Sequence, residues 1–186
     1  MNDGALNDGA LNDRWSAATI ILHWLSALVI MGLLVLGLLM VHAIDDAATK
    51  FDLYQWHKSI GFVALALLAL RLMARLRPAP PSLPMPAWER RAANAMHWTL
   101  YLLTLVAAVS GWLLASAAII PIPTRFFNWF VIPGIASPNA ALAEQMTLLH
   151  LGATWLMAAL VALHIAAALK HHFVNRDATL SRMLPR

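Results

Sequence analysis

The stretch HLGATWLMAALVALH, residues 150–164, decides the fold of this chain. It is apolar, rich in Leu and Ala, and it begins and ends on a histidine. On an α-helix, fourteen residues come within about 40° of four full turns, so both imidazoles lie on one face, about 21 Å apart along the axis. An apolar helix can accommodate one histidine, because imidazole can hydrogen-bond across helices. Two histidines on one stripe require a functional explanation.

The composition around this stretch is that of a membrane protein. Of the 186 residues, 61% are hydrophobic and 12% are charged, which is about half the usual share of charge, and the mean hydropathy is +0.67. Cysteine is absent, which excludes disulfides, thiolate nucleophiles, thiolate-held iron–sulfur clusters and covalent haem attachment through C-x-x-C-H. The pI near 10.1 does not indicate a nucleic-acid partner, because the basic residues flank apolar spans and suit membrane topology and anionic lipid better.

Four segments are long and apolar enough to cross about 30 Å of hydrocarbon. We expect them at residues 17–41, 54–75, 93–117 and 144–171. The connector RPAPPSLPMPAWERR, residues 77–91, is expected to be extended, because its prolines exclude helix. The connector IIPIPTRFFNWFVIPGIASPNAA is too interrupted by proline to span the membrane; its aromatics suit a loop in the interface, with a short re-entrant segment as the alternative. The sequence therefore predicts an all-α, transmembrane four-helix bundle that forms one domain over residues 15–186. The polar segment 1–14, with its tandem NDGAL repeat, lacks the pattern of a signal peptide and is expected to be a flexible tail.

The distribution of Lys and Arg predicts the orientation of these spans. One side of the membrane would hold ten of the thirteen basic residues: Arg14, Arg71, Arg75, Arg77, Arg90, Arg91, Lys170, Arg176, Arg182 and Arg186. The other side would hold Lys50, Lys58 and Arg125. Because cytoplasmic loops carry the excess of basic residues, both termini are expected in the cytoplasm.

This orientation gives a depth to each histidine of the spans. His23 falls in the cytoplasmic half and His57 in the outer half, while His150 lies near the outer face and His164 about 21 Å deeper. Two pairs result, His57 with His150 and His23 with His164. Each pair draws one side chain from each of two helices, as a metal centre with two imidazole ligands inside a bundle requires. Ionisable residues inside a membrane are functional candidates by default.

The residues available in the spans indicate which metal centre these pairs suit. Zinc and di-iron sites in bundles use carboxylates or larger histidine clusters, but no carboxylate lies deep in any predicted span. Neutral imidazole pairs without a thiolate favour two haem b groups, each with two axial histidines.

Three glycines are placed where a porphyrin would need space. Gly37 and Gly111 each follow a histidine of the cytoplasmic half by fourteen residues, which puts them at the level of the outer pair. Gly61 lies one turn beyond His57. Small residues let helix backbones approach closely, so ordinary helix packing is the alternative explanation.

Further polar residues are candidates for cofactor and substrate contacts on the cytoplasmic side. Arg71 lies fourteen residues after His57 and could pair with a haem propionate, or it could be a positive-inside anchor. His97 opens the third span and is a candidate propionate or quinone partner. His171 and His172 end the fourth span, where one of them could hydrogen-bond a quinone carbonyl or pass it protons.

Four stretches of the chain resemble the bacterial cytochrome b561 family: LHWLSALVI, WHKSIGFVALALLALRL, HWTLYLL and LHIAAALKHHFVNRDATLSRMLP. The similarity covers nearly all of residues 15–186, and the last stretch is the most specific. It implies a four-helix protein of the bacterial inner membrane with two haem b groups, which exchanges electrons with the ubiquinone pool. It also implies axial ligation by His23, His57, His150 and His164.

Superoxide oxidases are one type of member in this family, and resemblance to them implies a substrate. Superoxide would be oxidised at the periplasmic face and ubiquinone reduced at the other. Lys58, beside His57, and Arg125, in the outer loop, could attract the superoxide anion by their charge.

Two other functions remain open on the sequence. The chain could be the haem-b membrane subunit of a larger oxidoreductase, such as a hydrogenase or formate dehydrogenase, with the outer loop RFFNWFVIPGI as a docking surface. It could also be a histidine-based proton or metal transporter without haem.

Overall fold

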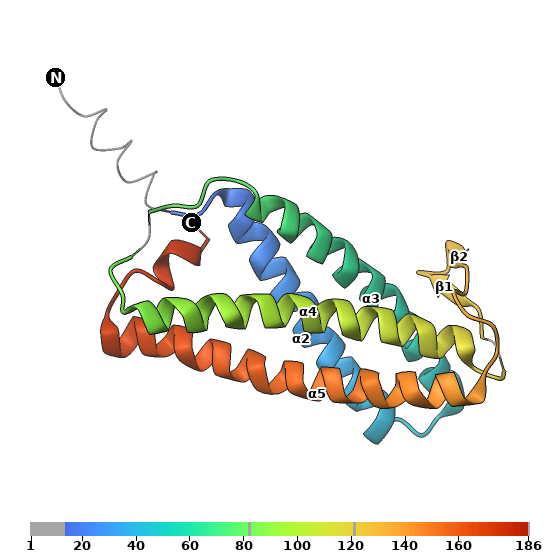
Figure 1. The fold of residues 1–186 in the computed structure, drawn as a ribbon. Helices are drawn as coiled ribbons and strands as arrows, with labels where there is room; N and C mark the ends of the chain where they lie inside the picture. The colour runs from blue at the N-terminus through green and yellow to red at the C-terminus, as the bar shows by residue number, and fades with distance from the viewer. Residues whose placement is uncertain (1–13, 82, 121, 186) are drawn as a thin grey trace.

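Four long helices dominate the structure, a computed structural model that describes residues 14–81, 83–120 and 122–185. They are α2 (Ala17–His42), α3 (Ala47–Arg75), α4 (Ala87–Ala117) and α5 (Ala140–Lys170), and they run lengthwise through the molecule (Figure 1). Each is long and apolar enough to cross a membrane, which confirms the four predicted spans. Apart from Arg14, the predicted N-terminal tail lies outside the described residues.

Polar N-cap residues precede three of the helices. Two of these helices, α3 and α5, begin before the spans that the sequence predicts. Side-chain oxygens of Ser16, Asp46 and Asn139 accept hydrogen bonds from backbone N–H groups in the first turns of α2, α3 and α5. Such caps satisfy N–H groups that have no partner within the helix. Because hydropathy marks the part of a helix that lies in lipid, α3 and α5 begin several residues before the apolar segments that predict them.

The proline-rich connector before α4 is shorter than the sequence predicts. Residues 77–91 were expected to be extended, but α4 begins at Ala87, directly after Pro86. Proline is compatible with the start of a helix because its missing N–H would have no helical partner there. The segment Trp88–Arg91 therefore adds a turn to the helix.

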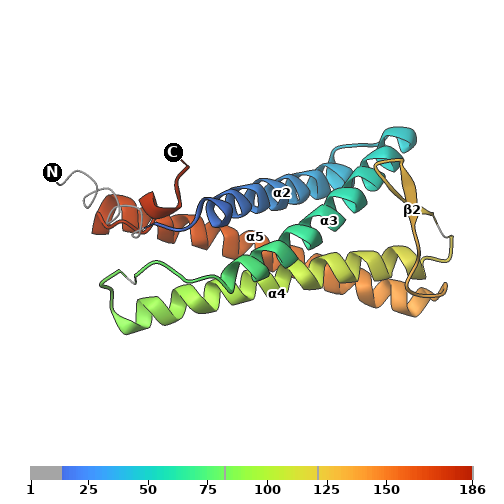
Figure 2. The same ribbon diagram turned by 90° about the horizontal axis from the view of Figure 1, so that it is seen from above.

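The helices associate most closely in two neighbouring pairs, α2 with α3 and α4 with α5, and α3 packs against α4 to join them (Figures 1 and 2). Leu103 of α4 forms the centre of the apolar core with Ala153 and Met157 of α5. Many large apolar side chains point outward, including Trp155, which is 61% exposed. An apolar exterior is the arrangement that a lipid environment favours.

The connector between α4 and α5 contains a small β-hairpin. Strands β1 (Thr124–Phe126) and β2 (Phe130–Ile132) pair antiparallel, with Thr124 opposite Ile132. Phe127 and Asn128 turn the chain with positive φ angles of 46° and 61°. As predicted, this connector does not span a membrane, although the sequence did not predict its strands.

Beyond α5 the chain folds back toward the start of α2. A short π-helix, η1 (His171–Asn175), ends at Arg176, whose φ is 55°, and a 3₁₀ turn, η2 (Ser181–Met183), follows. The Trp24 indole N–H donates to the Met183 carbonyl at 2.6 Å, and the Arg14 guanidinium donates to the Leu184 carbonyl. The two ends of the described chain thus meet at the same end of the bundle (Figure 1).

Candidate functional site

The structure brings together both histidine pairs that the depth argument predicts. At one end of the bundle, the ring centres of His57 on α3 and His150 on α5 lie 6.2 Å apart, with their planes at 78°. Toward the other end, the ring centres of His23 on α2 and His164 on α5 also lie 6.2 Å apart, at 65°. We call these the outer pair and the inner pair. In both, the rings approach from different helices.

The separation of the rings fits one metal ion between each pair. Metal–imidazole bonds measure about 2 Å, and a nitrogen lies about 1.1 Å from the centre of its ring. Two imidazoles that bind one iron from opposite sides therefore have ring centres about 6.3 Å apart. Both observed distances are 6.2 Å, so the residues present fit bis-histidine ligation at two levels.

A hydrogen bond orients His150 for this purpose. Its Nδ1 lies 2.9 Å from the carbonyl oxygen of Ala107 on α4, and the Ser110 hydroxyl is 3.4 Å from the same nitrogen. The carbonyl can only accept, so the partner assigns the proton to Nδ1 and leaves the Nε2 lone pair free for a metal. The Nδ1 of His57, in contrast, is buried and has no hydrogen-bond partner in the described part of the chain.

Two of the three predicted glycines face the outer pair. A Cβ added to Gly111 would lie 3.1 Å from Cε1 and 3.2 Å from Nδ1 of His150, and a Cβ added to Gly37 would lie 3.7 Å from Cε1 of His57. A side chain at Gly111 would therefore displace the His150 ring. A Cβ added to Gly61 would meet nothing within 4 Å.

The inner pair has additional polar neighbours. The ring of His97 on α4 lies 5.7 Å from that of His164, and the Arg71 guanidinium lies 3.2 Å from Nδ1 of His23. Three imidazoles thus surround the inner level. No cluster of three or more His, Cys, Asp or Glu side chains within the described residues is arranged to hold a metal ion.

At the outer end, two α3 side chains hold the hairpin. The Gln55 amide donates to the Pro123 carbonyl and accepts from the Arg125 N–H, both at 3.1 Å. The Ser59 hydroxyl accepts from the Phe127 N–H at 3.0 Å, and its one hydrogen is shared between the carbonyls of Gln55 at 2.9 Å and Arg125 at 3.0 Å. Lys58, the neighbour of Ser59, is half-buried, whereas Arg125 is exposed. The two predicted cations therefore lie on adjacent segments at this end.

At the opposite end, the two terminal histidines differ. Nδ1 of His171 lies 2.6 Å from Oδ2 of Asp177, and the Thr179 N–H donates to the other carboxylate oxygen at 2.8 Å. Burial alone would raise the pKa of Asp177, but its hydrogen bonds with Thr179 and His171 outweigh that effect and hold the pKa below its usual value. His172 is exposed and contacts Phe173 edge to face. Of the two, only His171 is held in place by a carboxylate.

Sequence reasoning missed several residues of these sites. Gln55 and Ser59 interrupt an apolar span with buried polar groups, which was a usable signal. Asp177 lies in the most specific stretch of the family resemblance and was not singled out. The Ala107 carbonyl, as a backbone atom on another helix, left no signal in the sequence.

Comparisons with known proteins find similarity over almost the whole length of this chain. The family model described as prokaryotic cytochrome b561 matches residues 14–186. The chain is 35% identical to cytochrome b561 homolog 2 of Escherichia coli over 175 residues, which cover 92% of each chain. It is 30% identical to cytochrome b561 homolog 1 of the same organism over 178 residues, 94% of this chain and 98% of the relative. It is 27% identical to a probable superoxide oxidase CybB of Yersinia pestis over 179 residues, 93% of this chain and 97% of the relative.

Proposed function

We propose a function from an established premise: this chain belongs to the prokaryotic cytochrome b561 family. The resemblance read from the sequence is thereby confirmed, and the chain is a membrane-bound haem protein of electron transport. We infer that it holds two haem b groups and transfers electrons from periplasmic superoxide to ubiquinone in the bacterial inner membrane. The observation that carries this proposal is the 6.2 Å separation found in both histidine pairs.

Each histidine pair is proposed to bind one haem iron. His57 and His150 would hold the outer haem iron, and His23 and His164 the inner one. Bound haem would supply a one-electron carrier at each level, while the protein sets its position and potential. The chain's own contributions are the His150–Ala107 hydrogen bond, the space beside Gly111, and Arg71 as a partner for a propionate of the inner haem.

The proposed orientation follows the basic residues. With both termini in the cytoplasm, the outer pair lies toward the periplasm and the C-terminal segment toward the cytoplasm. Each superoxide would lose one electron and leave as dioxygen, and two such electrons with two protons would convert ubiquinone to ubiquinol. Lys58 and Arg125 would raise the local concentration of the anion at the periplasmic end.

Two observations support superoxide as the substrate: the name of one relative and the positive charges at the proposed periplasmic end. The relative from Yersinia pestis carries superoxide oxidase in its name, and two cations lie on adjacent segments at the proposed periplasmic end. The quinone would bind near His171, where the Asp177 carboxylate orients the imidazole for proton transfer. His172 and His97 are further quinone candidates.

The decisive experiment combines haem counting with a superoxide pulse. The purified protein should contain two haem b per chain, and His57→Ala and His150→Ala should each lose the same spectral component, while His23→Ala and His164→Ala lose the other.

A superoxide pulse should reduce the wild-type haems, at a rate that falls with Lys58→Glu and with rising ionic strength. His171→Ala should slow only reoxidation by a ubiquinone analogue. Loss of one common haem in His57→Ala and His23→Ala would refute the pairing, and a wild type that superoxide cannot reduce would refute the substrate.

One observation favours a second function, the membrane subunit of a larger oxidoreductase. The hairpin exposes Trp129 and Phe130 by 80% and 56% of their surfaces, and exposed apolar patches often mark protein interfaces. Co-purification of a stoichiometric redox partner from the native membrane would support this function. Full superoxide oxidation by the isolated chain would argue against it.

A further inference from the structure

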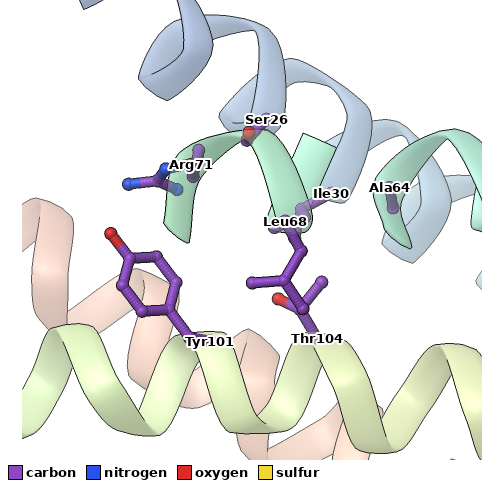
Figure 3. A pocket seen from close by; sticks show the side chains of 7 residues that line it. All are labelled: Ser26, Ile30, Ala64, Leu68, Arg71, Tyr101 and Thr104. Atoms are coloured by element: carbon purple, nitrogen blue, oxygen red, sulfur yellow. The ribbon is translucent and has the colours of Figure 1, made fainter. Parts of the chain in front are cut away.

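A pocket in the middle of the bundle is lined by Arg71, the proposed propionate partner of the inner haem. Arg71 reaches it from α3, while Tyr101 and Thr104 reach it from α4 (Figure 3). Ser26 of α2 and three apolar side chains complete the lining. The pocket borders the inner pair, because Arg71 also contacts His23.

Two of the four polar side chains in this pocket are satisfied on their own helices. The Ser26 hydroxyl donates to the Leu22 carbonyl at 2.6 Å, and the Thr104 hydroxyl donates to the Leu100 carbonyl at 2.8 Å. Their hydrogens are therefore not available to a ligand. The groups that can act on a ligand in this pocket are the Arg71 guanidinium and the Tyr101 hydroxyl.

Arg71 forms no ion pair with a carboxylate among the described residues. Arg71 is half-buried, and inside a membrane a cation without a counter-charge normally pairs with an anion or extends toward water. Its five N–H donors form a fork that matches a carboxylate. Arg75, one turn farther along α3, is exposed.

Tyr101 contacts the Arg71 guanidinium. The Arg71 Cζ lies 5.0 Å from the centre of the Tyr101 ring, and the tyrosine hydroxyl points toward the guanidinium (Figure 3). A cation is attracted to the face of an aromatic ring, more strongly where water is excluded. Arg75 is 5.8 Å from the same ring but stacks closer, at 4.9 Å, on Trp98. The two arginines are thus held at different depths.

We propose that Tyr101 is a positioning residue of the inner haem site, whose ring and hydroxyl hold the Arg71 guanidinium against a propionate carboxylate of the inner haem. This inference rests on the proposed function, in which His23 and His164 hold that haem. A fixed positive charge beside the haem stabilises its reduced form, which carries one positive charge fewer than the oxidised form. Tyr101 therefore acts on the potential of the inner haem through Arg71.

The test is a redox titration of the purified, haem-loaded protein that resolves both haem potentials. Tyr101→Phe keeps the ring and removes only the hydroxyl, so it should lower the inner potential and leave the outer one unchanged. Arg71→Gln should lower the inner potential further. In the double variant the Tyr101 substitution should add nothing, because residues that act through one another are not additive. Tyr54→Phe, the same substitution in the other tyrosine of the chain, is the matched control and should shift neither potential.

The outcomes separate this inference from the function on which it rests. If Arg71→Gln lowers the inner potential but Tyr101→Phe does not, Tyr101 only packs and the inference is overturned, while the proposed function stands. If Arg71→Gln changes neither potential, Arg71 is not at the haem and the inference also fails. If Arg71→Gln loses the inner haem, Arg71→Lys replaces it and should show a partial shift in potential. A wild type without a second haem overturns the proposed function itself.

Discussion

The hydrogen bond from His150 to the Ala107 carbonyl shows how a single contact prepares a residue for metal binding. It fixes the tautomer and the ring orientation before any metal arrives, and such outer contacts raise the basicity of the ligating nitrogen. His57 has no equivalent contact at its Nδ1. The two proposed ligands of the outer haem therefore differ, and His150 is the more rigid of the two.

The close approach of Gly111 to His150 predicts that a single added methyl group will disturb the outer haem site. Gly111→Ala would bring a Cβ to 3.1 Å from the His150 ring, so the ring must shift, and overpacking of this kind costs about 1–3 kcal/mol. We expect reduced occupancy of the outer haem, measured as haem per chain and by the loss of its spectral component. Gly111→Leu should have a larger effect.

Two neighbouring glycines are the controls for this prediction. Gly61→Ala has open space, and Gly37→Ala makes only an ordinary contact of 3.7 Å. Both should retain two haems per chain. Equal haem contents in all three alanine variants would show that Gly111 serves only helix packing.

At the scale of elements, the hairpin is attached to α3 largely by side chains. Gln55 and Ser59 lie one turn apart on α3 and together satisfy the backbone of Pro123, Arg125 and Phe127. Both side chains are buried, at 6% and 1% exposure. The position of Arg125 therefore depends on two residues of another element.

Removing the Gln55 amide should release the hairpin. Gln55→Leu removes the side-chain partner of the Arg125 N–H and of the Pro123 carbonyl, and each lost hydrogen bond costs about 0.5–1.5 kcal/mol. Hydrogen exchange at Arg125 should become faster, and the salt dependence of reduction by superoxide should weaken. Gln145→Leu, an exposed position on α5, is the control. Unchanged exchange in Gln55→Leu would mean that strand pairing alone holds the hairpin.

The C-terminal segment should loosen in acid because of Asp177. Its pKa is lower in the folded protein than the usual 3.8, so its contribution to stability is complete above pH 3.8 and is lost as the pH falls through the lower folded value. Hydrogen exchange over residues 176–185 should therefore accelerate only in that acidic range. Asp177→Asn should show fast exchange already at neutral pH, and the exposed Asp52→Asn should behave as wild type. A C-terminal segment equally protected in Asp177→Asn would contradict the prediction.

The elements also show what the sequence could predict. Apolar segments of about twenty residues predicted the four helices, and the depth of each histidine along its predicted span predicted which histidines lie close together, because both depend on spacing along the chain. The start of α4 at Ala87 and the strands at 124–132 depend on local hydrogen bonding around prolines, which hydropathy does not register. Contacts such as Gln55 to the hairpin and Tyr101 to Arg71 join distant segments, and their partners became visible only in the fold.

At the scale of the whole molecule, the proposed haem ligands connect the two helix pairs. The outer pair joins α3 to α5 and the inner pair joins α2 to α5, while direct packing between the helix pairs is mainly that of α3 with α4. Bound haems would thus link the two halves of the bundle, and the protein should be less stable without them.

Haem removal should lower the unfolding temperature in two steps. A ligand that binds only the folded state stabilises it by about 2.7 kcal/mol at a concentration one hundred times its Kd. Thermal unfolding in detergent should therefore rank wild type above His164→Ala, and His164→Ala above a variant that also carries His150→Ala. The exposed His172→Ala, which leaves both sets of proposed ligands intact, should unfold as wild type. Equal unfolding temperatures in all four proteins would show that haem does not connect the two halves.

The fourteen-residue interval between His150 and His164 has an electrical consequence. It separates the two levels by about 21 Å, roughly two thirds of a hydrocarbon layer of about 30 Å. In the proposed orientation, an electron that moves inward crosses that share of the membrane voltage against a negative interior. Moving one electron across the whole membrane costs about 2.3 kcal/mol per 100 mV. The transfer between the two levels therefore costs about 1.6 kcal/mol at 100 mV, which changes the equilibrium roughly fifteen-fold. An energised membrane would hold electrons back on the outer side, and collapse of the voltage would let them pass to quinone.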